Sequence, residues 1–352
     1  ITVEVMLPEP QTAVSDAYSI SEAAPEFSFS AVSTDAWARS IRGMEISYAK
    51  GNPDVLKLQY RPVSGGEWAD AVLSSDNGSV LSFDNITGLT PSTEYELRAI
   101  YNGNGNTAVT AVLTTEEAAQ VGNSGFEEWT DAIHEIDGWL STDKVNWYLP
   151  WKDASSAVWA VNSKVSMPDS YNAAYLSYKC HPTVSYLNTD AYEKTNYAQI
   201  VTVAVGAAAS EASNGTSYYG ELFIGSATDD GKYETTGTTF HSRPDKLAFY
   251  YKYSSYENEQ FYVHAEVRKS DGTVIATAHT DAGPASDGWT RYEMPFTYSD
   301  STSESASIFI AFRSTSSSSP KVRKMTIQEI GGSYTIHGGS ILCVDDLQLI
   351  YE

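Results

Sequence analysis

The amino-acid sequence predicts an all-β protein built from β-sandwiches. Its 352 residues include 24 tyrosines, 24 glycines and 13 prolines, a composition that favours strands and turns over helices. No window of about 15 residues carries the apolar repeat of a helix. The clearest strand follows a turn at residues 242–245, and its alternating side chains divide into two sets. One face carries Leu247, Phe249, Tyr251 and Tyr253, and the other carries Ala248, Tyr250 and Lys252. Because both faces are rich in apolar and aromatic groups, we expect a central strand of a sandwich.

Residues 1–116 are expected to form a small first sandwich. Turn signals such as Gly103-Asn104-Gly105 separate its strand-like runs. These runs are Glu26–Ala31, Met44–Tyr48, Val55–Arg61, Val80–Asp84, Glu94–Tyr101 and Ala108–Thr114. The segment from Leu89 to Ala99 resembles a corner of fibronectin type III modules, where a tyrosine bonds back to the backbone, and Tyr95 holds that place. The resemblance implies an Ig-like domain, and such modules are commonly spacers.

Residues 117–122 are expected to be a linker, and residues 123–352 a larger jelly-roll sandwich. Its expected strands are Tyr175–Tyr178, Tyr197–Val205, Gly220–Gly225, Leu247–Ser254, Gln260–Lys269, Val274–His279, Arg291–Tyr298 and Ser307–Ser314. The stretches 141–171 and 299–335 are expected to be long loops, a class that is usually functional or disordered. We expect the two domains to be separable near residue 118.

Charge and cysteine content narrow the class of partner. The formal net charge is −23 and the sequence pI is near 4.5, so nucleic acid, whose phosphates would be repelled, is not expected as a partner. The sequence has no transmembrane run, so we expect membrane contact only through a lipid anchor upstream of Ile1. Cys180 and Cys343 form no disulfide framework, and two separately buried thiols are favoured over one bridge.

Acidic residues stand at both ends of the second domain. It opens at Asn123-Ser124-Gly125-Phe126-Glu127 and closes with Val344-Asp345-Asp346. Because the first and last strands of a jelly roll can pair, Glu127 would lie beside Asp345 or Asp346, and paired carboxylates need a cation or a proton. Structural calcium is one interpretation, and a basic side chain is another. The apolar alternation also changes phase at the Asp pair, which predicts a β-bulge whose backbone could satisfy the carboxylates instead. No other cofactor is expected.

Six motifs follow one another through residues 123–352. They are Gly-Phe-Glu-Glu-Trp at 125–129, Gly220-Glu221-Leu222-Phe223, Phe240-x-x-Arg243-Pro244-x-x-Leu247, Tyr250-Tyr251-Lys252-Tyr253, Pro295-Phe296-x-Tyr298 and Gly339-Ser340-x-Leu342-x-Val344-Asp345-Asp346. In this order they resemble the putative carbohydrate metabolism domain (PCMD) family of Bacteroidetes. The resemblance implies an Ig-like domain before a jelly roll, a secreted protein or lipoprotein at the cell surface or in the periplasm, and a role in carbohydrate use. The chain departs from the family where a strand usually opens with Asp, since Gln260 and Tyr262 occupy that region.

A glycan-binding, non-catalytic protein is the first functional hypothesis. Sugar pockets stack sugar faces on Trp or Tyr and bind hydroxyls with charged or amide groups. The candidate ligand-binding residues are Trp147, Trp151, Tyr219, Arg243, Tyr251, Lys252 and Tyr253. The turn at Pro244 is expected to place Arg243 in or beside the main pocket, within reach of Tyr251 or Lys252. The alternatives are core positions for the aromatics, and a structural ion pair with Asp245 or a turn carbonyl for Arg243.

A glycoside hydrolase is the second hypothesis, and a structural or adhesin-like surface protein is the third. A hydrolase needs two carboxylates facing across a cleft, and Glu266 and Glu293 are the candidates. His264, Glu266 and Arg268 share one strand face, which would otherwise be a salt-bridged surface. The sequence lacks a Gly-x-Ser-x-Gly elbow, a phosphate loop and zinc-ligand spacing. Opposed carboxylates in a pocket would favour the enzyme, and aromatics with Arg or Lys would favour binding.

Overall fold

The structure is a computed structural model in which two compact units can be distinguished. It describes residues 26–50, 52–101, 104–138, 142–170, 180–205, 216–280 and 283–352, together with β1 (Glu4–Val5) and β2 (Gln11–Thr12). The first unit comprises residues 1–31, 43–86 and 94–113, and the second comprises residues 32–42, 87–93 and 114–352. The predicted all-β class is confirmed, since the described parts of the chain contain strands and short 3-10 helices but no α-helix. None of these helices is long and apolar enough to cross a membrane.

The first unit contains two four-stranded sheets. One has the order β3 (Glu26–Phe29), β5 (Glu45–Ala49), β9 (Val80–Phe83) and β8 (Leu73–Asp76). The other has the order β12 (Asn104–Thr114), β11 (Glu94–Tyr101), β6 (Leu56–Pro62) and β7 (Ala69–Asp70). Alternate side chains on these strands are buried, as Leu56 and Leu58 show on β6. The short helix η2 (Pro53–Val55) also belongs to this unit, whereas η1 (Ser33–Asp35) and β4 (Ser40–Ile41) lie in residues 32–42 of the second unit, and β4 pairs with β10 (Ile86–Thr87).

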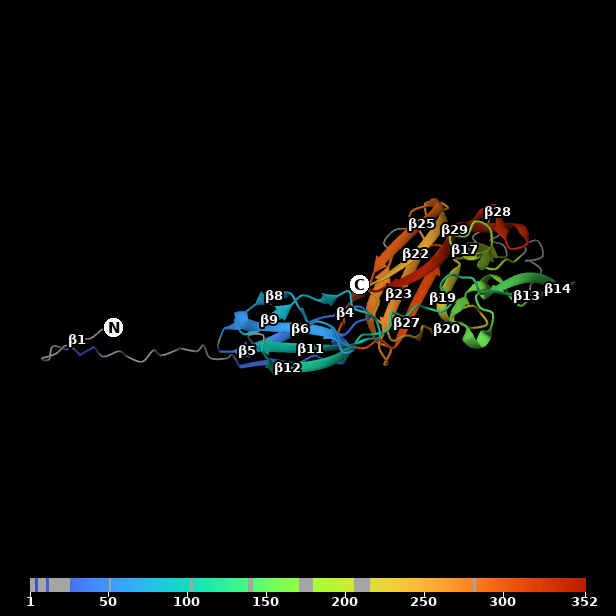
Figure 1. Cartoon of the computed structure of the whole chain (residues 1–352). Helices are drawn as coiled ribbons and strands as arrows, with labels where there is room; N and C mark the ends of the chain where they lie inside the picture. The colour runs from blue at the N-terminus through green and yellow to red at the C-terminus, as the bar shows by residue number, and fades with distance from the viewer. Residues whose placement is uncertain are drawn as a thin grey trace. The chain divides into compact units, whose positions relative to one another are not determined.

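The second unit is built mainly from two large sheets (Figure 1). The first sheet has the order β15 (Trp159–Val161), β19 (Glu221–Ala227), β27 (Ser307–Arg313), β23 (Tyr262–Arg268), β24 (Val274–His279) and β26 (Thr297–Tyr298), with β20 (Tyr233–Thr236) and β21 (Thr238–Thr239) added at β19 and β27. The second has the order β16 (Val184–Leu187), β17 (Tyr197–Val205), β29 (Gly332–Ile350), β22 (Lys246–Ser254) and β25 (Ser286–Pro295), with β18 (Thr216–Tyr218) on β17 and β28 (Arg323–Glu329) on β29. A separate hairpin joins β13 (Thr130–Asp137) to β14 (Thr142–Leu149), and two 3-10 helices follow, η3 (Ala154–Ser156) and η4 (Ser163–Ser166).

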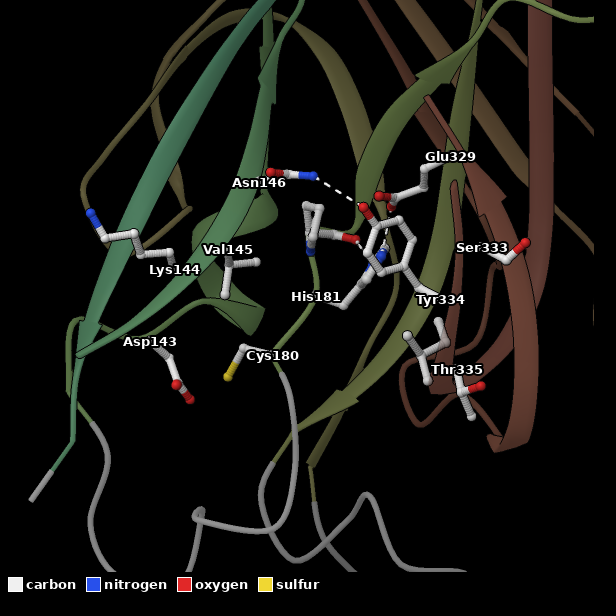
Figure 2. A pocket seen from close by; sticks show the side chains of 12 residues that line it. Asp143, Lys144, Val145, Asn146, Cys180, His181, Glu329, Ser333, Tyr334 and Thr335 are labelled. Carbon is white, nitrogen blue, oxygen red and sulfur yellow. Dashed lines mark hydrogen bonds and ion pairs between the residues drawn. The ribbon is translucent and has the colours of Figure 1, made fainter. Parts of the chain in front are cut away.

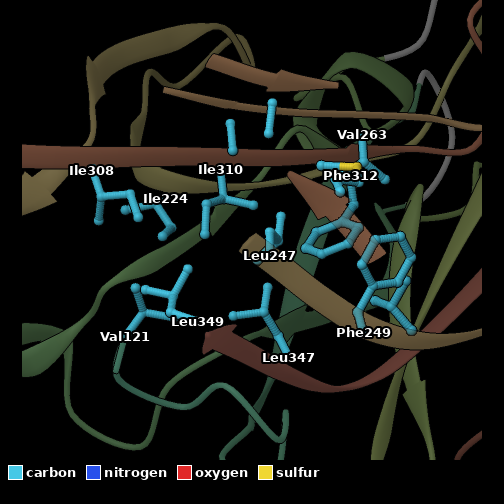
Figure 3. Close-up of a cluster of buried hydrophobic side chains, with 14 of the residues drawn as sticks. Val121, Ile224, Leu247, Phe249, Val263, Ile308, Ile310, Phe312, Leu347 and Leu349 are labelled. Atoms are coloured by element: carbon cyan, nitrogen blue, oxygen red, sulfur yellow. The ribbon is translucent and has the colours of Figure 1, made fainter. Parts of the chain in front are cut away.

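The core of the second unit lies between its two sheets. Apolar side chains of β27, including Ile308, Ile310 and Phe312, lie over Leu247 and Phe249 of β22 (Figure 3). The prediction of β22 as a central strand is confirmed, because it pairs with β29 on one side and β25 on the other. A tight turn joins β23 to β24, with Gly272 at a φ of +84°. Cys180 and Cys343 are both buried thiols that no disulfide joins.

The structure differs from the sequence expectations at three places. Residues 142–149, expected in a loop, form β14, because they pair along their whole length with β13. Within 299–335, β28 pairs with the start of β29 across a turn at Gly331, whose φ is +84°. The opening residues 123–129 are not a strand, since Asn123 and Phe126 adopt φ values of 50° and 51° that turn the chain. The strand expected at 175–178 lies outside the described residues.

Candidate functional site

Two of the tryptophans predicted to bind sugar line the same cavity, which we call the tryptophan pocket. Trp147 lies on β14 and Trp151 follows the end of that strand, while Trp159 comes from β15. The cavity has a volume of about 330 Å³, and Lys164, Ala160 and residues 225–229 complete its wall. Trp147 and Trp151 are half-buried, whereas Trp159 is fully buried in the core. The pocket therefore offers two partly accessible indole surfaces.

Charged groups lie at the edge of the tryptophan pocket. The Lys164 ammonium lies 5.3 Å from the centre of the Trp147 ring and 3.1 Å from Asp169 Oδ1. Asp229, on the turn after β19, is exposed and also lines the pocket. Aromatic faces beside a cation and a carboxylate can bind a hydroxyl-rich ring, because the faces contact its C–H groups and the charges bond its hydroxyls.

Arg243 is fully enclosed in the second unit, which differs from its predicted position beside a pocket. Its side chain is 1% exposed, and Nε donates to Glu116 Oε1 at 2.7 Å. The two terminal nitrogens donate to the carbonyls of Ser301 and Ala36, each at 2.9 Å. Burial raises the pKa of the Glu116 carboxyl although the Arg243 charge opposes it. The predicted partner Asp245 is instead 2.7 Å from Arg42.

Tyr251 and Tyr253 lie on one face of β22 and Lys252 lies on the other, because successive strand residues point to opposite faces. Tyr251 and Tyr253 are each 1% exposed in the core, where the Tyr253 hydroxyl donates to the Ser314 carbonyl at 3.1 Å. Lys252 lies on the outer face of the second sheet. Its ammonium pairs with Asp190 and lies 4.5 Å from the centre of the Trp289 ring.

Tyr219 and the predicted catalytic residues lie away from the tryptophan pocket. The Arg313 guanidinium lies 4.9 Å from the Tyr219 ring centre, and its Nε donates to Glu221 Oε1 at 2.5 Å. Glu266, on β23, accepts from Arg268 Nε at 2.7 Å and lies 2.7 Å from His264 Nε2. Burial raises the pKa of Glu266, but these two partners outweigh it and leave the pKa below its ordinary value. Glu293 belongs to β25 of the other sheet, where it pairs with Arg291.

The acidic residues at the two ends of the second domain hold one loop, residues 190–196. Asp345 Oδ2 accepts hydrogen bonds from the backbone N–H groups of Tyr192 and Glu193 at 2.9 and 3.1 Å. Glu127 accepts from the N–H of Thr195 at 3.2 Å. The predicted bulge is confirmed, since the β22–β29 register shifts beside Asp345. Asp346 accepts instead from the Gln348 amide at 2.8 Å.

Burial dominates the electrostatics of this acidic pair. It raises the pKa of Asp345 to about 6, with the Glu127 charge adding to the effect. Among the described residues, no group of three or more His, Cys, Asp or Glu side chains is arranged to hold a metal. Calcium at Glu127 and Asp345 therefore stays a prediction, with backbone N–H groups as the partners that the structure shows.

Sequence reasoning missed a second cavity, of about 540 Å³. Asp143, Asn146, His181, Glu329 and Tyr334 are among its lining residues (Figure 2). Alternating side chains at residues 323–329 could have predicted the strand β28. This strand carries the buried Glu329, which lies near β14. We call this cavity the Tyr334 pocket.

Comparison with known proteins gives only distant likenesses. No family model matches the chain, and no curated protein matches it in sequence. A putative glycoside hydrolase from Bacteroides vulgatus superposes with a TM-score of 0.42 at 19% identity, covering 65% of this chain and 97% of that one. A putative glycoside hydrolase from Bacteroides thetaiotaomicron gives 0.41 at 14% identity, covering 97% and 99%. A family 11 carbohydrate-binding module of a Clostridium thermocellum cellulase gives 0.24 at 15%, covering 56% and 89%. Functional arguments therefore rest on the residues of the site.

Proposed function

We propose that this chain is a carbohydrate-binding protein whose main site is the tryptophan pocket. The observation that carries the proposal is the meeting of Trp147 and Trp151 in one cavity beside Lys164. Indole faces contact the C–H faces of sugar rings, while lysine and aspartate bind hydroxyl groups. At about 330 Å³ the cavity is at the lower end of ligand pockets, which suits one or two sugar rings.

Binding is favoured over glycoside hydrolysis by the state of the predicted carboxylates. Glu266 is occupied by Arg268 and His264, and Glu293 belongs to a different sheet, so they do not face each other across a cleft. The proposal includes membership of the PCMD family and a secreted or cell-surface role in carbohydrate use, which the order of the six sequence motifs supports. A lipid anchor upstream of Ile1 belongs to the same proposal.

Affinity gel electrophoresis in a series of neutral polysaccharides tests the tryptophan pocket. The wild-type chain should be retarded by at least one of them, and Trp151→Ala should weaken that binding by tenfold or more, since a central tryptophan contributes roughly 2 kcal/mol or more. Trp289→Ala is the matched control, because Trp289 lies near Lys252 on the other sheet. Loss of binding in Trp289→Ala with full binding in Trp151→Ala would move the site to that face and overturn the proposal.

A further inference from the structure

Strand β14 lines both the Tyr334 pocket and the tryptophan pocket, but with different residues. Successive strand residues alternate, so Trp147 faces one way and Asn146 and Tyr148 face the other. The contacts agree, because Trp147 lies near Lys164, whereas Tyr148 bonds to Glu329 of β28. Different residues of β14 thus line two cavities, of about 330 and 540 Å³.

A chain of hydrogen bonds fixes the aromatic wall of the Tyr334 pocket. The Tyr148 hydroxyl donates to Glu329 Oε2 at 3.1 Å, and the Asn146 amide donates to the hydroxyls of Tyr148 and Tyr334 at 3.1 and 3.3 Å. The ring of Tyr334 also lies 5.9 Å from that of His181 (Figure 2). Because Tyr334 is only half-buried, one part of its ring is held in place while another part borders the cavity.

The His181–Glu329 contact anchors this chain. His181 Nδ1 lies 2.8 Å from the Pro182 carbonyl, so that nitrogen donates, and Nε2 lies 2.6 Å from Glu329 Oε1. The contact is close, although its angles are not those of a hydrogen bond. With side chains 7% and 1% exposed, the pair is a support for the wall and not a group open to ligand.

We propose that the Tyr334 pocket is a second carbohydrate site, in which a neutral sugar ring stacks on Tyr334. The cavity lining contains both donors and acceptors, which suits hydroxyl groups, because each hydroxyl both donates and accepts. The cavity lining adds the polar side chains of Asp143, Ser333 and Thr335, and Asn146 keeps its Oδ1 as an acceptor. Acidic sugars are disfavoured, since Lys144 is already 2.8 Å from Glu135 and the chain has a net charge of −23.

The second site makes the domain bivalent. Both pockets are lined by residues of β14, but they share no lining residue, so one ligand does not exclude another. A polysaccharide with many equivalent segments can occupy both sites, either with one chain or with two. Binding to the polymer is then tighter than binding to a short oligosaccharide, because the second contact is made at a high effective concentration.

Isothermal titration calorimetry with short neutral oligosaccharides tests this second site. The probes are hexasaccharides of xylose, glucose, mannose and galactose, with a galacturonic acid hexasaccharide as the acidic comparison. We expect two molecules of a neutral probe per wild-type chain, one for Tyr334→Ala, one for Trp151→Ala and none for the double variant. Tyr334→Phe, which keeps the ring, should still bind two. Ser333→Trp, which narrows the pocket from an exposed position, should reproduce Tyr334→Ala without touching the hydrogen-bond chain.

Each outcome assigns the failure to one site. The alternative result is that the wild-type chain binds one molecule of probe. If Trp151→Ala abolished that binding, while Tyr334→Ala and Ser333→Trp left it unchanged, the second site would be overturned and the tryptophan pocket would be supported. A stoichiometry of one that depends on Tyr334 alone would support the second site and overturn the proposed main one. Binding of none of the probes would overturn both, and tighter binding of the acidic probe would overturn the stated ligand class.

Discussion

Replacing Arg243 with methionine tests the conclusion that this residue is structural. The substitution keeps a long side chain but removes the charge and every donor. It leaves the Glu116 carboxylate without its ion-pair partner, and it leaves the Ala36 and Ser301 carbonyls without their hydrogen-bond donors. Removing one partner of a buried ion pair costs about 3–5 kcal/mol, because the other charge is left in a poorly solvated place.

This cost translates into a large change in melting temperature. For a domain of this size, roughly 2–4 °C are lost per kcal/mol, so the second unit should melt about 6–20 °C lower in Arg243→Met. Lys232→Met is the matched control. It breaks an ion pair with Asp230 whose side chains are 77% and 57% exposed, and such pairs contribute less than about 1 kcal/mol.

Differential scanning calorimetry of the full chain measures both variants. Adding Glu116→Leu to Arg243→Met should raise the melting midpoint part of the way back to the wild-type value, because it removes the unpaired buried carboxylate. Equal midpoints for Arg243→Met and Lys232→Met would refute the reasoning. Arg243 would then contribute no more than a surface residue, despite its burial.

Other contacts lead to three more expected outcomes. Burial raises the pKa of Asp345 to about 6 from 3.8, so the folded state holds an extra proton between these values, and stability should fall as pH rises through about 6. Asp345→Asn should flatten that slope in urea titrations, and parallel curves for the two proteins would contradict it. Calcium between Glu127 and Asp345 would relieve the same charge, so its excess should raise the melting midpoint; equal midpoints in calcium and in EDTA would remove this site. A fragment of residues 118–352 lacks Glu116 and also residues 32–42 and 87–93 of the second unit, so it should melt below the second unit of the intact chain, and equal melting would show that these segments do not stabilise it.

Alternation was enough to predict much of the fold. Residues 246–254 alternate so strongly that only a central strand can bury both faces, and the structure places β22 between β29 and β25. The bulge beside Asp345 was predictable for the same reason, because a change of apolar phase requires an extra residue in the strand. Among the strands that were missed, β14 and β28 carry many polar side chains, and each pairs with a neighbouring strand, β13 or β29.

The sequence by itself determined which residue types could bind sugar, but not where they would lie. Trp147 and Trp151 are close along the chain and end in one pocket, while Tyr251 and Tyr253 have equally suitable side chains and lie in the core. Arg243 looked like a ligand-binding cation, yet its partners Glu116 and Ala36 are more than a hundred residues away and were invisible in its local sequence. Strand register and the packing of distant segments determine whether such a side chain lines a pocket or lies in the core, because burial and hydrogen bonding depend on neighbours in space. Only the tertiary structure could bring His181, Glu329 and Tyr334 together around a second pocket.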